Sequence, residues 1–489
     1  MIFSSIQYFL FLPVVVFLYW RLKGFPRLAL VVAASYFFYM SWMPIYGVLL
    51  FGLSTLSWAL GLAIGKWRES SPGLARASLV SGIVLNLACL IYYKYANFLL
   101  ANIFVRLRQI GVQLQLDSMS QLSTPVLDVI LPLGISFFVF EFVHYLVDVY
   151  KGSKQVKSWF EFSAFAAFFP SQIAGPIKRY QDFCDNLRNP LPWSKELFYE
   201  GMTLIAQGLF KKVAIADPIA WVIAPSYAAL EPISAVDAWI AFFGFSIQIF
   251  CDFSGYTDMG RGSALLLGIR LPVNFHVPYI AEDISLFWRR WHISLSSWIR
   301  DYVYIPMGGS RCSYFTGLKN LLVTMTVCGF WHGAAWQFIL WGALHGLALM
   351  VNRVYKSVLD KIPALQQVLS LAPMRLINVA VTFMFVAACF VFFRAPGLQM
   401  AFNIFLSLNN FGMESNTAVL LIRTGVLVFA SVYMGFWILT ELLKKKNHLS
   451  EPSQLVFPMQ IRLAAWTATM LFLFAARPNQ VTPFIYFQF

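Results

Sequence analysis

The sequence predicts an all-α integral membrane protein that crosses the bilayer about ten or eleven times, at about 20 apolar residues per crossing. Of its 489 residues, 59% are hydrophobic and only 12% are charged. An ordinary soluble domain carries about 25% charged residues. The aromatic content of 17% suits a chain with belts of tryptophan and tyrosine at the membrane surfaces. This composition excludes a soluble enzyme, a secreted disulfide scaffold and a disordered chain.

The expected elements follow the apolar runs of the sequence. Several runs are too short, or too rich in glycine and charge, to be simple spans, so we expect re-entrant and interfacial amphipathic helices as well. No repeat or separate soluble domain interrupts them, and we therefore expect a single membrane domain over residues 1–489. The runs lie at 5–20, 28–41, 45–65, 77–103, 125–149, 159–176, 198–223, 236–251, 258–269, 318–351, 376–393, 424–443 and 461–476.

The basic residues predict how these runs are oriented. The formal net charge is +14, but the charges lie between apolar runs and form no single basic face, which argues against nucleic-acid binding. Lysine and arginine gather in the turns 21–27, 66–76 and 151–157. Because such turns face the cytoplasm, both termini are expected on the periplasmic side. The first run has no basic region before it and no cleavage site after it, so it is interpreted as a retained span rather than a signal peptide.

The same rule predicts a hairpin in the run 318–351. The segments on either side of it, 289–319 and 353–375, are both basic and are both expected in the cytoplasm. The run must then form a re-entrant hairpin or two short crossings, with its bend at 329–333. Non-helical backbone at membrane depth persists only where it is buried in protein or lines a wet cavity, so the bend is a candidate site.

His332 lies at this bend, between glycines that let other backbone or a ligand approach closely. A buried imidazole is neutral and can accept a proton, as a general base must. The alternative is a core histidine that is hydrogen-bonded to a carbonyl group. His345 follows thirteen residues later and, at helical spacing, is expected to point elsewhere. A metal site on His292, His332 and His345 lacks a recognisable ligand spacing, and none of the six cysteines forms a C-x-x-C pair, so no metal and no disulfide is expected.

Three further groups of polar residues are of interest. Segment 282–311 is expected to form an amphipathic helix, with Phe287, Trp291, Leu295 and Trp298 on one side and Arg289, His292 and Ser296 on another; the alternative is an interfacial anchor. Asp252 and Asp258 lie at an expected helix break and are candidate functional carboxylates. The alternative is that this segment is only a capped break between two short helices. Glu141, His144 and Asp148 share one helix face and are expected to form a structural network.

Several motifs resemble the signature of the membrane-bound O-acyltransferase (MBOAT) superfamily, and most of all its bacterial branch that contains the alginate O-acetyltransferase membrane subunit. The resemblance covers essentially the whole chain, although Ser310 stands where relatives often carry asparagine. The motifs are Trp288-Arg289-Arg290-Trp291-His292-Ile293-Ser294-Leu295-Ser296, Arg300-Asp301-Tyr302, Tyr304-Ile305-Pro306-Met307-Gly308-Gly309 and Trp331-His332-Gly333-Ala334, with Tyr93-Lys94-Tyr95, Leu131-Pro132-Leu133-Gly134, Ala174-Gly175-Pro176, Asp252-Phe253-Ser254-Gly255-Tyr256 and Tyr486-Phe487-Gln488-Phe489.

The resemblance implies an acyltransferase built around a central tunnel, with its core motifs at about 248–351. It places His332 in the position of the principal catalytic histidine and His292 in that of the second. It also implies transfer of acetyl from a cytoplasmic donor, expected to be acetyl-CoA, across the bacterial inner membrane to a polysaccharide such as alginate. Implied partners are periplasmic acetyl-transfer proteins and an exopolysaccharide synthesis complex, with membrane lipids around the protein. Residues expected to line the tunnel or bind substrate are Trp288, Arg289, Arg290, Ser296, Asp252 and Trp331.

Two alternatives to acetyl transfer stay open at this point. One is D-alanyl or other acyl transfer to a wall polymer of the teichoic-acid type. The other is a transporter or flippase that uses Glu141, His144 and Asp252 as an intramembrane relay, although we find no inverted repeat. The aromatic C-terminus is also open: Tyr486, Phe487 and Phe489 either dock a periplasmic partner or pack back onto the domain.

Overall fold

The computed structural model describes residues 1–446 except 116, 174 and 416. Every regular element in this part of the chain is helical, so the expected all-α class is confirmed. Within these described residues, five helical stretches are long and apolar enough to cross a membrane; how many times the chain crosses in all stays a prediction. These stretches are Pro44–Ser70, Pro72–Gln113, Ala235–Leu266, Trp336–Leu359 and Ala372–Arg394.

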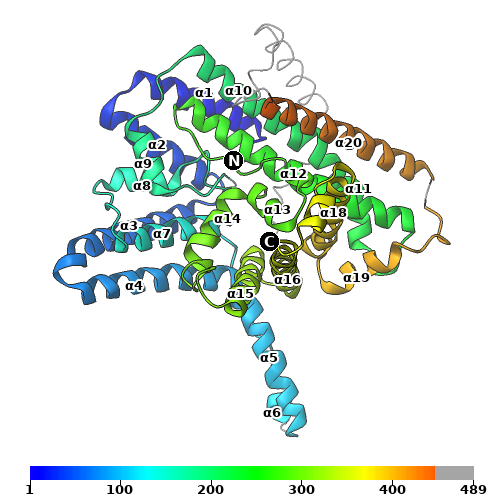
Figure 1. The fold of residues 1–489 in the computed structure, drawn as a ribbon. Helices are drawn as coiled ribbons and strands as arrows, with labels where there is room; N and C mark the ends of the chain where they lie inside the picture. Colours follow the sequence, from blue (N-terminus) through cyan, green and yellow to red (C-terminus); the bar gives the residue numbers. More distant parts are fainter. Residues whose placement is uncertain (116, 174, 416, 447–489) are drawn as a thin grey trace.

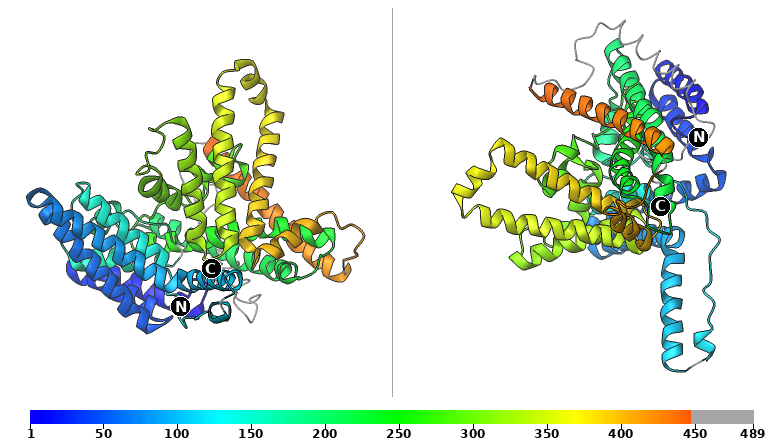
Figure 2. Two further views of the ribbon diagram at one scale, coloured as in Figure 1. Left: turned by 90° about the horizontal axis from the view of Figure 1, so that it is seen from below. Right: turned by 90° about the vertical axis from the view of Figure 1, so that its right-hand side faces the viewer.

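The N-terminal helices form one side of the molecule (Figure 1). They agree with the first four apolar runs, and a π-turn at Ile91–Tyr95 joins α4 to α5 without a break. Together α5 and α6 extend away from the rest as an arm (Figures 1 and 2). The helices are α1 (Ile6–Arg21), α2 (Gly24–Met40), α3 (Pro44–Ser70), α4 (Pro72–Leu90), α5 (Ala96–Gln113) and α6 (Asp117–Ser120).

The next two apolar runs are only partly helical, which corrects their expected extents. In run 125–149 the helix α7 (Ile135–Tyr150) begins late, because Pro132 cannot donate a backbone hydrogen bond and Gly134 takes a left-handed conformation with φ 71°. In run 159–176 only α8 (Trp159–Ala167) is helical, and Pro170 and Pro176 lie in the irregular chain that follows. Helix α9 (Tyr180–Arg188) completes this side.

The opposite side is organised around α12 (Ala235–Leu266), an unbroken helix of 32 residues. The expected break at 251–258 is therefore absent. Gly255 and Gly262 serve instead for close packing, because a Cβ atom there would lie 2.7 Å and 2.5 Å from the carbonyl oxygens of Gly208 and Gly201. Those two glycines belong to α10 (Lys195–Phe210), which continues through a π-turn at Lys211–Ala216 into α11 (Asp217–Ala228).

The remaining helices fill the centre and close the second side (Figure 1). Among them, α15 and α16 form the hairpin expected for run 318–351, but its non-helical bend is at 333–335 rather than at the expected 329–333, because α15 stays helical through His332. They are η3 (Pro278–Ile280), α13 (Ile284–Arg290), α14 (Ile293–Ile299), the π-turn η4 (Arg300–Tyr304), α15 (Tyr314–His332), α16 (Trp336–Leu359), α17 (Pro363–Leu369), α18 (Ala372–Arg394), α19 (Leu398–Ser407) and α20 (Thr417–Lys446).

Ion pairs gather the basic segments at one end of the hairpin. Lys356 Nζ lies 2.9 Å from a carboxylate oxygen of Asp283, and Arg375 reaches Glu282. The bend 333–335 is at the other end of α16, whose 24 residues extend about 36 Å at 1.5 Å per residue. The two basic segments therefore lie together, which agrees with the expectation that both are on the cytoplasmic side of the membrane. The expected span 461–476 and the C-terminal aromatic residues fall outside the described residues.

Candidate active site

His332 is the last residue of α15 and is 4% exposed. It enters the interior because α15 and α16 pack unusually closely. A Cβ atom on Gly342 would lie 3.0 Å from the Cα atom of Gly329 on the facing helix. The glycines near the bend thus let another backbone approach, as the sequence predicted, and no side chain holds the two helices apart.

A lysine and a tyrosine from the π-turn 91–95 hold the end of α15. Lys94 Nζ donates to the carbonyl oxygens of Trp331 and His332 at 2.8 Å and 2.9 Å. The Tyr95 hydroxyl donates to the carbonyl of Phe330 at 3.1 Å. Carbonyl groups in the last turn of a helix have no partner within it, so these bonds fix the backbone that carries His332. Sequence reasoning gave Lys94 no role; the available signal was a lysine within an apolar run.

His292 lies between α13 and α14 in a left-handed conformation, with φ 43° and ψ 54°. The single amphipathic helix expected over 282–311 is therefore wrong, because the chain breaks at this residue. Asn274 stabilises the break: its side-chain oxygen accepts from the Ser294 backbone N–H at 3.1 Å and from the Ser294 hydroxyl at 2.6 Å. The break turns His292 inward, fully buried, while Arg289 stays exposed.

The apolar stripe of that segment is buried as expected. Phe287, Trp291, Leu295 and Trp298 are each no more than 5% exposed. They form the wall on which the histidine cluster rests rather than an interfacial anchor.

Aromatic rings join the two histidines. The Trp331 ring lies between them, with centroid distances of 6.4 Å to His292 and 4.8 Å to His332. Trp341 and Phe393 each lie 5.0 Å from the His332 ring. The two imidazole rings therefore sit in a tightly packed aromatic environment that limits their rotation.

His345 belongs to the same cluster, which corrects the expectation that it points elsewhere. Its ring is fully buried and lies 4.7 Å from Trp341, the same ring that contacts His332. The Trp288 indole donates to His345 Nδ1 at 3.3 Å. Helical spacing failed here because the chain reverses at 333–335, so His332 and His345 are on facing helices.

Several buried polar atoms of the cluster have no hydrogen-bond partner within the described residues. They are both ring nitrogens of His292, the indole nitrogens of Trp331 and Trp341, and His345 Nε2. Buried polar atoms in proteins are nearly always hydrogen-bonded, and exceptions call for an explanation. Their convergence on one place is typical of a site that binds a polar ligand.

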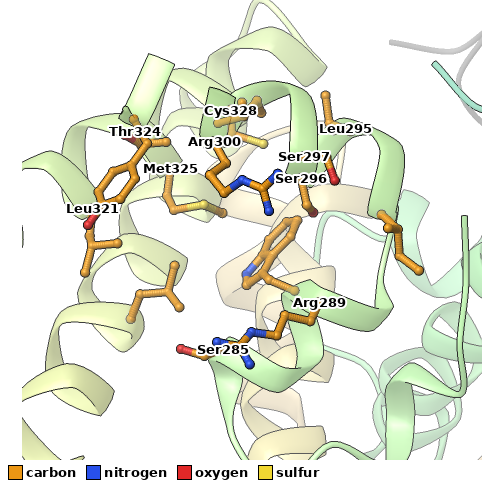
Figure 3. A pocket seen from close by; sticks show the side chains of 15 residues that line it. Ser285, Arg289, Leu295, Ser296, Ser297, Arg300, Leu321, Thr324, Met325 and Cys328 are labelled. Carbon is orange, nitrogen blue, oxygen red and sulfur yellow. The ribbon is translucent and has the colours of Figure 1, made fainter. Parts of the chain in front are cut away.

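A cavity of about 420 Å³ adjoins the cluster on the side of the basic segments. Figure 3 shows Arg289 and Arg300 reaching toward its interior from the α13 and η4 side. Trp288, Arg289 and Ser296 line it, whereas Arg290 and Asp252 do not. Arg289 has no ion pair with any described residue. The cavity ends at Cys328, one helical turn before His332.

A second cavity, of about 520 Å³, lies at the bend and includes Gly333, Gln337 and Lys94 in its lining. Since Cys328 lines the first cavity and Gly333 the second, His332 lies between them along the chain. Along the hairpin, the first cavity is lined by α15 residues that precede His332 and the second by residues that follow it, and His332 itself is not among the lining residues of either.

Two of the acidic residues noted in the sequence, Glu141 and Asp252, form ion pairs with lysines. Glu141 pairs with Lys178 at 2.7 Å, and Asp252 pairs with Lys212 at 2.7 Å. His144 Nε2 accepts the backbone N–H of Tyr180 at 3.3 Å, and Asp148 accepts the Tyr302 hydroxyl at 2.7 Å. Glu141, His144 and Asp148 thus each have a structural partner, although no hydrogen bond between them is seen and His144 Nδ1 has no partner among the described residues.

The fold and this site define a polytopic helical membrane protein with a histidine cluster buried between two cavities. The sequence model of the membrane-bound O-acyltransferase (MBOAT) family matches residues 38–394 of this chain. The chain belongs to this family and is an acyltransferase.

Relatives with curated names narrow the comparison. The chain is 35% identical to a probable alginate O-acetylase of Pseudomonas putida over 100% of both chains. It is 31% identical to a peptidoglycan O-acetyltransferase of Helicobacter pylori, over 98% of this chain and 96% of that one. It is also 31% identical to a teichoic acid D-alanyltransferase of Bacillus subtilis, over 44% of this chain and 58% of that one. The first two similarities extend over nearly the whole length and the third does not.

Proposed function

We propose that the protein is an O-acetyltransferase that moves acetyl from a cytoplasmic donor, acetyl-CoA, across the bacterial inner membrane for O-acetylation of a periplasmic or extracellular polysaccharide such as alginate. The observation that carries this proposal is the position of His332 along the hairpin, between the residues that line one cavity and those that line the other. Donor and acceptor can then reach one imidazole from opposite directions. The full-length similarity to two named O-acetyl transferases favours acetyl as the group that is moved.

The donor enters through the first cavity in this proposal. Its floor is apolar, with Met325, Cys328 and Leu295, and its rim carries Arg289 together with several hydroxyl groups. A long, flexible thioester with a phosphorylated end suits such a lining, because the arginines attract phosphate while the apolar floor receives the acyl arm. This cavity faces the basic segments, which are expected in the cytoplasm.

Transfer then requires one proton acceptor and stabilisation of one oxyanion. His332 takes the proton of the acceptor hydroxyl, the oxygen attacks the thioester carbonyl, the C–S bond breaks, and the thiol leaves with a proton. Neighbouring donors, His292 or the Trp331 indole, stabilise the oxyanion, an effect worth about 3 kcal/mol per well-placed donor. In the alternative route His332 attacks the thioester itself and carries the acetyl group before passing it on.

The wider assignments belong to the same proposal. Residues 1–489 form one membrane domain with both termini in the periplasm. Periplasmic acetyl-transfer proteins and an exopolysaccharide synthesis complex receive the acetyl group, and Tyr486, Phe487 and Phe489 dock such a partner. D-alanyl transfer is the second candidate, because the chain is similar to a teichoic acid D-alanyltransferase. It ranks second because that similarity covers less than half of this chain. The transporter alternative is weaker, since Glu141 and Asp252 are each held in an ion pair with a lysine.

Replacement of the two site histidines tests the proposal. His332→Gln should leave expression and membrane insertion near normal and lower acetate transfer by about 10²- to 10⁴-fold, the range of positioned acid–base catalysis. His292→Gln should also lower transfer. The measurement is ester-linked acetate per unit of extracellular polymer.

The exposed His276 provides the matched control. It replaces His345 in that role, because His345 contacts the same tryptophan as His332. His276→Gln should transfer acetate at the normal rate. If a well-folded His332→Gln protein retains more than about a tenth of normal transfer, the assignment of His332 is wrong.

A further inference from the structure

Helix α5 runs crosswise to the hairpin of α15 and α16 and starts at its bend. Figure 1 shows the hairpin nearly end-on with α5 extending away from it, and the left view of Figure 2 shows the hairpin upright with α5 end-on. The root of α5 contacts Trp336, the first residue of α16. The Phe98 ring lies 5.8 Å from the Trp336 ring, whose indole donates to Asn102 at 3.2 Å.

The crossing that α4 begins does not need α5. The 19 residues of α4 extend about 28 Å at 1.5 Å per residue, close to the thickness of about 30 Å of the hydrocarbon layer. The whole helical stretch of 42 residues, Pro72–Gln113, extends about 63 Å, twice that thickness. The chain changes direction at the π-turn Ile91–Tyr95 (Figure 1), as helices often do at such turns. The crossing can therefore end at the π-turn.

One face of α5 is covered by the chain that returns from its far end, residues 121–130. The Asn97 side chain exchanges two hydrogen bonds with the backbone of Leu127, at 3.0 Å and 2.8 Å. Arg108 donates to the Leu122 carbonyl and to the Thr124 hydroxyl, both at 3.0 Å. These bonds hold α5 and the returning chain together as one arm.

The remaining surface of α5 carries an apolar stripe and a narrow polar stripe, both at helical spacing. Large apolar side chains are exposed there: Leu99 by 40%, Ile103 by 52% and Leu114 by 62%. Such a surface is unfavourable in water and is typical of a helix that lies at a membrane surface. The apolar stripe is Leu99, Ile103, Leu107, Ile110 and Leu114, and the polar stripe is Asn102, Arg106, Gln109 and Gln113.

We propose that α5 lies flat in the periplasmic leaflet of the membrane, with its apolar stripe among the acyl chains and its polar stripe toward water. The end of the hairpin opposite the bend carries the ion pairs of the basic segments, which are expected in the cytoplasm. The bend end is then at the periplasmic surface. A helix that leaves the bend crosswise to the hairpin runs along this surface, where an apolar stripe sinks about 5–10 Å into the lipid.

The lipid contact also affects the cavity at the bend. Tyr93 and Lys94 precede α5, Leu131 follows the returning chain, and all three line this cavity. Lipid that holds the arm therefore holds one wall of the cavity and keeps its opening at the membrane surface. A periplasmic acetyl-transfer protein can then approach His332 from that surface. This last step rests on the proposed function, whereas the lipid contact does not.

Spin labels on single cysteines test the lipid contact in the full-length protein, reconstituted without partners in vesicles of phosphatidylethanolamine and phosphatidylglycerol. The partly exposed Cys89 and Cys312 are first replaced by alanine. Collision rates are measured with oxygen, which enters lipid, and with a nickel chelate, which stays in water. The labelled variants are Ile103→Cys, Leu107→Cys and Ile110→Cys in the apolar stripe, with Arg106→Cys, Gln109→Cys and Gln113→Cys in the polar stripe as matched controls.

The ratio of oxygen to nickel collisions should be at least about fivefold higher in the apolar stripe than in the polar stripe, because only the former reaches the acyl chains. Labels at 103 and 110 should lie at the same depth, whereas a helix that crosses upright would separate them by about 10 Å. Equal access of nickel to both stripes would show an arm that stands free in water for a protein partner and would overturn the proposal. Exclusion of nickel from both stripes would overturn it too.

A pair of charge substitutions tests the consequence for the cavity. Leu107→Asp should loosen the arm from the lipid and lower ester-linked acetate on the polymer several-fold in protein that is still inserted. Gln109→Asp, in the polar stripe, should transfer acetate normally. Normal transfer by Leu107→Asp, with the label pattern as expected, would uphold the lipid contact and refute the effect on the cavity. Absence of acetate transfer in the unsubstituted protein would refute the proposed function and leave the label result unchanged.

Discussion

At the scale of single residues, the backbone of His292 decides where its imidazole points. Its φ of 43° is unfavourable for any residue with a Cβ atom, by about 1–2 kcal/mol, and glycine avoids this cost. We predict that His292→Gly is more stable than His292→Ala by about 1 kcal/mol, although both lose the imidazole and therefore lose transfer. Thermal unfolding in detergent gives the difference in stability. Equal stabilities would contradict the left-handed break that turns the ring inward.

Trp288 provides a second prediction at this scale, because its indole is the donor to His345 Nδ1. Trp288→Phe keeps most of the packing but leaves a buried acceptor without a partner, which should lower the free energy of unfolding by about 1–3 kcal/mol. Trp336 is the matched control. It is 56% exposed and donates to Asn102 at the surface, so Trp336→Phe should cost no more than about 0.5 kcal/mol. Similar losses in the two variants would refute a structural role for the buried bond.

Sequence reasoning located part of this site and missed part of it for a clear physical reason. His332 and the apolar stripe from Phe287 to Trp298 follow from local spacing and from the need for a bend, so both could be predicted. The inward turn of His292 depends on the two hydrogen bonds from Ser294 to the side chain of Asn274, which lies 20 residues before Ser294 in the chain and outside any helix. The approach of His345 likewise depends on how two facing helices pack.

At the scale of elements, the α15–α16 hairpin depends on glycines where the two backbones meet. A Cβ atom on Gly342 would lie 3.0 Å from both the Cα and the N atom of Gly329. Gly342→Ala should therefore push the helices apart, cost about 1–3 kcal/mol as overpacked sites do, and lower acetate transfer by displacing His332. Thermal unfolding and the polymer acetate assay measure the two effects.

Gly52 in α3 is the control for this change, because a Cβ atom there meets nothing within 4 Å. Gly52→Ala should be neutral or should stabilise the helix by up to about 1 kcal/mol. Normal activity in Gly342→Ala would show that the close approach of the two helices does not position the histidine.

The elements themselves were predictable to different degrees. Runs such as 45–65 and 376–393 are uniformly apolar and became the helices α3 and α18. The runs 236–251 and 258–269 are separated in the sequence by a polar segment that contains Gly255, and in the structure this glycine allows α12 to pack against α10. A glycine in a helical run indicates either a break or a close contact, and the sequence alone does not distinguish them.

At the scale of the whole molecule, the position of the N-terminus constrains the topology. The α-amino group of Met1 donates to the Ser41 hydroxyl at 2.8 Å, so the N-terminus and the turn between α2 and α3 lie at the same face. The turn between α1 and α2 carries Lys23 and lies at the other end of both helices. This arrangement agrees with alternate turns on opposite sides of the membrane.

The last prediction concerns which parts of the chain face the cytoplasm and which face the periplasm. Reporter fusions after residues 24, 44 and 489 should place residue 24 in the cytoplasm and residues 44 and 489 in the periplasm, because basic turns stay inside. Helix α1 has only 16 residues, about 24 Å at 1.5 Å per residue, so its crossing requires a locally thinned bilayer or flanking residues that reach to the surface. If residues 24 and 44 report the same side, α2 does not cross and the first two helices lie within one leaflet. A cytoplasmic residue 489 would reverse the orientation of the last span and, with it, the proposed docking of a periplasmic partner at Tyr486 to Phe489.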